Sequence, residues 1–359
     1  MINRKCISKE WIEHKSKTLK ADKILVEKVI RALILLEGLV ESGLDFTFKG
    51  GTALMLMLEN SRRLSIDIDI IIEDKTSDLS VFVNSIVQRK DFIRVEKQER
   101  KANSKIDKEH YKLFFLSAVE EKEAYILLDV LKEKNHYQNI INTPVKSIFT
   151  EQSDDDICKV KTPDFNNLLG DKLTAFAPNT TGIPYKKGDK EMGMEIIKQL
   201  YDIGILFDYF DNSVIVSSVF QSFAKTEIAY REKQFSTLDV LNDITNNALE
   251  ICLRGNYGKS DFGVLLRGIN RVRGFIFSET FHLEKAITYA AKTVYIAALI
   301  RHESADIKRY STRHLPEISN WQITNLNTKL NKLKKTNTEA FFYLYQASEL
   351  FNYKDEIEE

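Results

Sequence analysis

Cysteine, proline and glycine are scarce in this sequence, which argues against a disulfide-rich protein and against a largely disordered one. The 359 residues include three cysteines, five prolines and 14 glycines. Cys6, Cys158 and Cys252 stand far apart without metal-ligand spacing, which indicates reduced thiols of a cytoplasmic protein rather than a disulfide framework. So little proline and glycine argues for long regular elements and few disordered linkers.

An excess of one charge and a long apolar run are also lacking. Lys plus Arg and Asp plus Glu number 52 each, so a general polyanion-coating role is not indicated, although local basic patches remain open. The first 17 residues contain no apolar stretch typical of a signal peptide. The apolar segment 286–300 has 15 residues and contains Lys292, which is too short to cross a bilayer. We expect a cytoplasmic protein with no membrane partner.

What the chain does have is a change of pattern near residue 163. Before it, residues 21–42, 50–60 and 76–89 have helical patterns, and five runs are extended: 46–49, 65–72, 92–100, 110–119 and 123–133. From residue 194 onward nearly every segment has helical periodicity. We therefore predict an α+β fold: a mixed sheet with helices over residues 1–163, largely antiparallel toward one edge, and an all-helical domain over residues 164–359.

Two aspartates interrupt the isoleucines of the run "SIDIDIII". Residues two apart in a strand point to one face, so Asp67 and Asp69 project together while Ile66, Ile68 and Ile70 face the core. Adjacent carboxylates repel each other, and a divalent cation such as Mg²⁺ removes that repulsion. An edge strand with a solvated polar face is the alternative.

A third carboxylate lies in "YILLDVL", where Asp129 is surrounded by leucine and valine. Such a group is costly to bury unless a cation meets it. A core aspartate paired with arginine or lysine is one interpretation. If its strand lies beside the first, three carboxylates converge on a two-metal site suited to phosphoryl or nucleotidyl transfer.

Gly50-Gly51-Thr52 separates a predicted strand from a predicted helix. Such a turn lets backbone N–H groups and a hydroxyl approach phosphate oxygens at the positive end of a helix. It could also be only a tight turn, and the hydroxyls of Thr52 and Ser65 could equally be turn or cap residues.

These residues resemble the first motif of the nucleotidyltransferase fold, in particular the AbiEii/AbiGii branch, the toxin component of type IV toxin–antitoxin systems. That branch tends to have K-G-G-T-A-L followed by R-x-S-x-D-[LI]-D-[FL]. The matching residues here are Lys49–Leu54, Arg63, Ser65, Asp67 and Asp69. By strand pattern, Asp129 matches the third carboxylate of the wider fold, and the resemblance makes all three aspartates catalytic metal ligands.

A second block, "LLGDKLTAFA" and "IKQLYDIGILF", resembles two helices of the same family. The resemblance assigns Lys172 and Lys198 to the nucleotide phosphates and gives Asp202 a catalytic role. Gln199 stands where the family usually has an acidic residue. From the residues alone, each lysine could lie on a solvated helix face, and Asp202 could either orient Lys198 or form a routine surface pair with it.

The resemblance covers residues 20–210 and implies transfer of a nucleotide from an NTP with Mg²⁺, to an RNA end such as the tRNA 3′ end or to a protein hydroxyl. It also implies a cognate antitoxin. Residues 301–335 hold eight Lys/Arg against three Asp/Glu, with interspersed aromatics, a composition typical of RNA contact and also of ordinary helix surfaces. Rival functions are a non-catalytic nucleotide- or antitoxin-binding protein of this fold, and an antibiotic-modifying nucleotidyltransferase.

Overall fold

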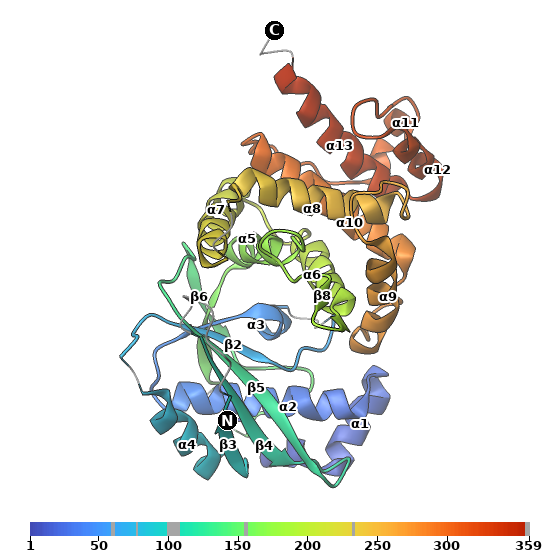
Figure 1. The fold of residues 1–359 in the computed structure, drawn as a ribbon. Coiled ribbons are helices and arrows are strands. Elements are labelled where there is room, and N and C mark those ends of the chain that lie inside the picture. The colour runs from blue at the N-terminus through green and yellow to red at the C-terminus, as the bar shows by residue number, and fades with distance from the viewer. Residues whose placement is uncertain (59–61, 77, 99–107, 154–156, 232–233, 356–359) are drawn as a thin grey trace. The chain divides into compact units, whose positions relative to one another are not determined.

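The chain divides into two compact units in the computed structural model, which describes residues 1–58, 62–76, 78–98, 108–153, 157–231 and 234–355 (Figure 1). Unit 1 comprises Met1–Asp164 together with Gly274–Thr280. Unit 2 comprises Phe165–Arg273 and Phe281–Glu359.

Unit 1 is built on a five-stranded sheet with the strand order β1-β2-β5-β4-β3. The strands are β1 (Thr47–Lys49), β2 (Ile68–Ile72), β3 (Arg94–Lys97), β4 (Lys108–Leu116) and β5 (Glu123–Lys132). β2 and β5 are parallel, and the other neighbouring pairs are antiparallel. The prediction of a mixed sheet that is antiparallel toward one edge is therefore confirmed.

The helices of unit 1 pack around a core that the sequence pattern anticipates. They are η1 (Arg4–Ile7), α1 (Lys9–Leu19), α2 (Lys23–Glu41), α3 (Gly50–Met57) and α4 (Leu79–Arg89). Ile68, Ile70 and Ile72 of β2 join one hydrophobic cluster with the buried residues of α2. Alternation along β2 thus sends these isoleucines to one face of the sheet, as predicted.

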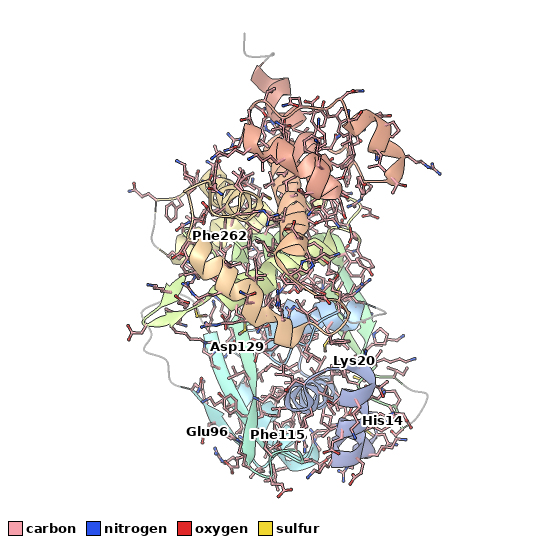
Figure 2. The ribbon with its side chains drawn as sticks, turned by 90° about the vertical axis from the view of Figure 1, so that its right-hand side faces the viewer. His14, Lys20, Glu96, Phe115, Asp129 and Phe262 are labelled. Atoms are coloured by element: carbon pink, nitrogen blue, oxygen red, sulfur yellow. The ribbon has the colours of Figure 1, made fainter. Side chains whose placement is uncertain are left out.

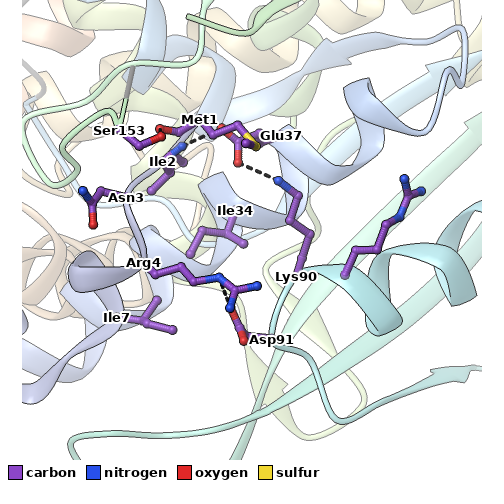
Figure 3. A pocket seen from close by; sticks show the side chains of 11 residues that line it. Met1, Ile2, Asn3, Arg4, Ile7, Ile34, Glu37, Lys90, Asp91 and Ser153 are labelled. Carbon is purple, nitrogen blue, oxygen red and sulfur yellow. Dashed lines mark hydrogen bonds and ion pairs between the residues drawn. The ribbon is translucent and has the colours of Figure 1, made fainter. Parts of the chain in front are cut away.

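A buried glutamate of α2 anchors the first residues of the chain. Glu37 is 2% exposed and accepts the Ile2 N–H at 2.7 Å. Its other oxygen accepts a hydrogen bond from Lys90 Nζ at 2.8 Å. Figure 3 shows these two bonds at the edge of a pocket of about 270 Å³, where Arg4 and Asp91 form a longer ion pair. Outside the sheet, β6 (Ile140–Pro144) and β7 (Lys159–Pro163) pair as an antiparallel hairpin.

Unit 2 is helical, as predicted, apart from the two-residue strands β8 (Lys186–Lys187) and β9 (Lys190–Glu191). Its longer helices are α5 (Phe165–Ala175), α6 (Gly193–Leu206), α7 (Ser213–Tyr230), α8 (Thr237–Cys252), α9 (Phe262–Val272), α10 (Leu283–Arg301) and α13 (Thr338–Asp355). Its short helices are η3 (Thr312–His314), α11 (Leu315–Ile318), η4 (Thr328–Lys332) and α12 (Leu333–Thr336), and η2 (Arg273–Phe275) lies where the chain passes between the units.

The apolar segment 286–300 lies in α10 and is buried at every position. Its lysine is neutralised inside the unit, because Lys292 Nζ lies 2.7 Å from Asp208 and 3.3 Å from Glu339. Across the residues that the structure describes, no helix combines the length and the hydropathy that a bilayer span requires.

Candidate functional site

Four polar side chains form a row across the sheet of unit 1. Lys49 on β1 is the register partner of Asp69 on β2, and Asp69 is the register partner of Asp129 on β5. His110 on β4 is in turn the partner of Asp129. Register partners point to the same face of a sheet. These four side chains, which we call the polar row, therefore share one face.

The polar row lies on the face opposite the hydrophobic core. Ile68 and Ile70, which flank Asp69 in sequence, are core residues, as are Leu128 and Val130 around Asp129. Because β2 pairs with β1 on one side and β5 on the other, it is not an edge strand, and that alternative for the aspartate pair is wrong. Two of the predicted carboxylates are thus brought together on adjacent strands, which lie about 4.8 Å apart in any sheet.

Asp129 has a histidine as its partner rather than the arginine or lysine of the alternative interpretation. His110 Nδ1 lies 2.6 Å from Asp129 Oδ1. The His110 side chain is 11% exposed and the Asp129 side chain 37%. In Figure 2, Asp129 lies toward one end of the sheet and Phe115 of β4 toward the other. His110 belongs to none of the motifs that single out the aspartates, although its place between core-facing positions of β4 puts it on the opposite face.

The double glycine brings α3 directly against the polar row. Gly50 has φ +81°, and a Cβ built on it would lie 2.2 Å from Asp69 Oδ2. A Cβ on Gly51 would lie 2.5 Å from Arg63 Nη2 and 2.8 Å from Ser65 Oγ. Conformation and contact therefore both favour glycine at Gly50, whereas a Cβ at Gly51 would require the Arg63 guanidinium and the Ser65 hydroxyl to move.

Thr52 ties α3 to the segment that precedes β2. Its side chain is fully buried, and its hydroxyl donates a hydrogen bond to the Asp67 carbonyl oxygen at 2.6 Å. The hydroxyl hydrogen thus fixes the backbone at the first aspartate of the motif. Contact of Thr52 and Ser65 with a phosphate stays a prediction.

The N-terminus of α3 is suited to an anion. Lys49 occupies the N-cap position, and its side chain makes no capping hydrogen bond to the helix. The first N–H groups of a helix have no partner inside it and carry partial positive charge. Since Asp69 lies against Gly50, an anion at this terminus would need a cation between itself and the carboxylate.

The donors of this site have the chemistry that Mg²⁺ prefers. Mg²⁺ is commonly held by one or two carboxylates together with water and substrate phosphate, and the adjacent Asp69 and Asp129 supply two. Among the described residues, no group of three or more His, Cys, Asp or Glu side chains is already arranged to hold a metal ion. Asp67 lies just before β2, and its joining the other two as a third ligand stays a prediction.

The second predicted block lies in unit 2, where it forms a buried ion pair. Lys172 Nζ on α5 lies 2.9 Å from Asp202 Oδ2 on α6, with side chains 7% and 1% exposed. Lys172 also donates to Gln199 Oε1 at 3.1 Å. The solvated-face interpretation of Lys172 is therefore wrong, and the residue at the usually acidic position takes part in the same cluster. Roles of Lys172, Asp202 and the half-buried Lys198 toward a nucleotide remain predictions.

The spacer between α5 and α6 is fixed by two side chains of unit 2. Asp243 accepts hydrogen bonds from the backbone N–H groups of Asn179 and Thr180 and from both side chains. Burial raises the pKa of Asp243 above its ordinary value despite these four donors. Arg231 donates to the carbonyl oxygens of residues 180–182. The two side chains thus fix residues 179–182 of the spacer.

Comparison with known proteins places the chain among nucleotidyltransferases. The family model described as nucleotidyl transferase AbiEii toxin, type IV TA system, matches residues 34–257. No curated protein matches the chain.

Three similar solved structures have low sequence identity to this chain. JHP933 from Helicobacter pylori is 13% identical, with a TM-score of 0.45 over 79% of this chain and 96% of that one. A putative nucleotidyltransferase from H. pylori is 14% identical, with a TM-score of 0.43 over 79% and 97% of the two chains. The nucleotidyltransferase toxin MenT4 from Mycobacterium tuberculosis H37Rv is 12% identical, with a TM-score of 0.42 over 86% and 97%.

Proposed function

Because this chain belongs to the nucleotidyl transferase AbiEii toxin family of type IV toxin–antitoxin systems, we propose that it transfers a nucleoside monophosphate from an NTP to an RNA acceptor with the help of Mg²⁺. The family fixes the reaction class and the toxin role. The metal, the acceptor, a cytoplasmic location and a cognate antitoxin that neutralises the enzyme are parts of the proposal.

One observation carries the proposal. The carboxylate of Asp69 lies against Gly50 at the start of α3 and beside Asp129 on the neighbouring strand. An anion alone would be attracted by the helix terminus but repelled by the two carboxylates. A triphosphate carrying divalent cations matches both parts, since its phosphates suit the N–H groups and its metal suits the carboxylates.

Residues of unit 1 would bind the phosphates, hold the metal ions and activate the acceptor hydroxyl. Backbone N–H groups at Gly50, Gly51 and Thr52 bind the β- and γ-phosphates. Asp67 and Asp69, with Asp129, would hold a two-ion Mg²⁺ site, which would shield the phosphate charge and lower the pKa of the acceptor hydroxyl. Asp129 would help to activate that hydroxyl, whose proton passes to solvent. The acceptor oxygen bonds to the α-phosphorus in line as the bond to the β-phosphate oxygen breaks, and pyrophosphate leaves.

An RNA acceptor is supported by a basic and aromatic surface in unit 2. Lys329, Lys332 and Lys335 are exposed on η4 and α12. The half-buried ring of Trp321 stacks on Tyr345 with centroids 4.4 Å apart. Exposed cations and a stacked aromatic pair from the same region of unit 2 suit a flexible RNA end such as the tRNA 3′ end.

Labelling with each of the four α-³²P NTPs tests the proposal. Purified protein is incubated with MgCl₂ and bulk tRNA, and separately with total protein, in wild-type, Asp69→Asn and Asp45→Asn forms. Asp45 is an exposed residue of the same unit whose carboxylate forms a surface pair with Lys161, so its loss should cost little. We expect label on tRNA with one NTP for the wild type and Asp45→Asn, and at least a 10³-fold lower rate for Asp69→Asn, consistent with loss of a metal-held transition state.

Other outcomes identify the rivals. Label on a protein hydroxyl would replace RNA as the acceptor. Label on an aminoglycoside added in a parallel incubation, with tRNA untouched, would indicate an antibiotic-modifying enzyme. Nucleotide binding without transfer by any NTP would indicate a non-catalytic protein of this fold.

A further inference from the structure

We infer that His110 is a positioning residue for Asp129, holding one carboxylate oxygen so that the other is presented to a divalent cation. The inference rests on the proposed function, because it concerns the same metal site. It assigns a role to a residue that lies outside every motif by which the chain resembles its family.

The contact between the two side chains has the geometry of a specific hydrogen bond. His110 Nδ1 and Asp129 Oδ1 are 2.6 Å apart, and the two residues are direct register partners on β4 and β5. An ionised carboxylate can only accept, so Nδ1 carries the hydrogen. Within the described part of the chain, Asp129 Oδ2 has no hydrogen bond or ion pair, and it is the oxygen left for a ligand.

Core packing does not explain the imidazole. The core-facing residues of β4 are Tyr111, Leu113 and Phe115, which belong to the hydrophobic cluster. His110 alternates with them and therefore lies on the face of the polar row. An aliphatic side chain there would bury similar area without the cost of desolvating a ring nitrogen.

The neighbouring carboxylate explains why such a donor is useful. Asp69 and Asp129 are register partners on one face, and their like charges favour rotamers that turn the carboxylates apart. A hydrogen bond from a buried ring on the far side of Asp129 offsets part of that repulsion and fixes the carboxylate in one rotamer. Partners that orient a metal-binding carboxylate typically contribute about 10–100-fold in metal affinity or activity.

The test compares His110→Ala, which removes the donor, with His110→Asn, whose amide nitrogen can replace Nδ1. Binding of MnCl₂ alone is followed by the EPR signal of free Mn²⁺, and nucleotidyl transfer is measured over a range of MgCl₂ concentrations. We expect His110→Ala to weaken Mn²⁺ binding about tenfold and to raise the Mg²⁺ concentration for half-maximal rate by a similar factor. His110→Asn should stay within about threefold of the wild type on the same scale. His14→Ala is the control, since His14 is exposed on α1 and lies apart from Asp129 (Figure 2).

Three results would overturn the inference. Equal Mn²⁺ binding by His110→Ala and the wild type would show that the ring does not position the carboxylate. Equal losses in His110→Ala and His110→Asn, accompanied by equal falls in melting temperature, would show a packing role. Either result with a wild type that still labels its acceptor leaves the proposed function intact. A wild type that transfers no nucleotide yet shows the expected Mn²⁺ series refutes the proposed transfer alone, and a wild type that binds no Mn²⁺ refutes both.

Discussion

Gly50→Ala should damage both the stability and the activity of this protein, because Gly50 satisfies two requirements at once. Its φ of +81° lies in the left-handed region, and an added Cβ would lie 2.2 Å from Asp69 Oδ2 and 3.0 Å from Asp69 Cγ. Asp69 must therefore move or the start of α3 must shift. Either change displaces a proposed metal ligand from the helix terminus that is proposed to bind phosphate.

The loss of stability caused by Gly50→Ala can be separated into a conformational and a steric part with a matched control. Gly43 has φ +79°, and no heavy atom lies within 4 Å of its added Cβ, so Gly43→Ala measures the conformational cost alone, about 1–2 kcal/mol. Gly50→Ala adds the steric conflict, for which overpacking in a tight site suggests about 1–3 kcal/mol more. The free energy of unfolding should thus fall by about 2–5 kcal/mol for Gly50→Ala.

Urea unfolding followed by circular dichroism gives both free energies, and the NTP-labelling assay gives the rates. We expect Gly43→Ala to retain near wild-type transfer and Gly50→Ala to lose at least 100-fold, since a displacement of about 1 Å at a reacting centre has this effect. The reasoning is refuted if Gly50→Ala destabilises the protein no more than Gly43→Ala and transfers nucleotide at the wild-type rate.

Three further predictions concern buried groups elsewhere in the chain. Asp202→Ala leaves the charge of Lys172 buried without its partner, and the free energy of unfolding in urea should fall by about 3–5 kcal/mol; a loss under 1 kcal/mol would contradict the buried pair. Glu250 accepts hydrogen bonds from four backbone N–H groups of residues 257–260, and Glu250→Gln replaces one of its two acceptor oxygens with an NH₂ group. We expect the free energy of unfolding in urea to fall by about 2–4 kcal/mol, and little change would contradict this role of the carboxylate. Burial, and to a smaller extent two nearby glutamates, raises the pKa of Cys158 from 9.0 to about 11. The reactive thiolate is correspondingly rarer, so alkylation of Cys158 by iodoacetamide at pH 8 should be about 100-fold slower than in the urea-unfolded chain and should speed up with pH until the thiol titrates. Equal alkylation rates in the folded and unfolded chains would refute the shift.

Local patterns were sufficient to predict β2, β5 and the helical region of unit 2. The alternation of isoleucine with Asp67 and Asp69 predicted that Ile68 and Ile70 face the core and that Asp69 faces the other side. This prediction follows from the two-residue repeat of a strand, which is visible in any single sequence. The helical region from residue 194 onward was equally predictable because its apolar positions recur with helical spacing.

Contacts between distant segments were not predictable in the same way. His110 was missed because register between β4 and β5 decides its partner, and no local signal encodes that register. The pairing of Lys172 with Asp202 was missed for a related reason: spacing along α6 favoured Lys198 as a neighbour, whereas packing of α5 on α6 supplied Lys172. The hairpin of β6 and β7 likewise depends on segments that are separated in the chain.

The polar row also has a consequence for how the protein is made. Its members come from chain positions 49, 69, 110 and 129, and the parallel pairing of β2 with β5 joins segments separated by a long excursion of the chain. Parallel strands close slowly, because the connecting loop must be ordered before any of their hydrogen bonds form. A nascent polypeptide emerging from the ribosome therefore cannot assemble this row until β5 has been synthesised and has docked. Because β5 ends at Lys132 of the 359 residues, the site cannot form before more than a third of the chain has been translated.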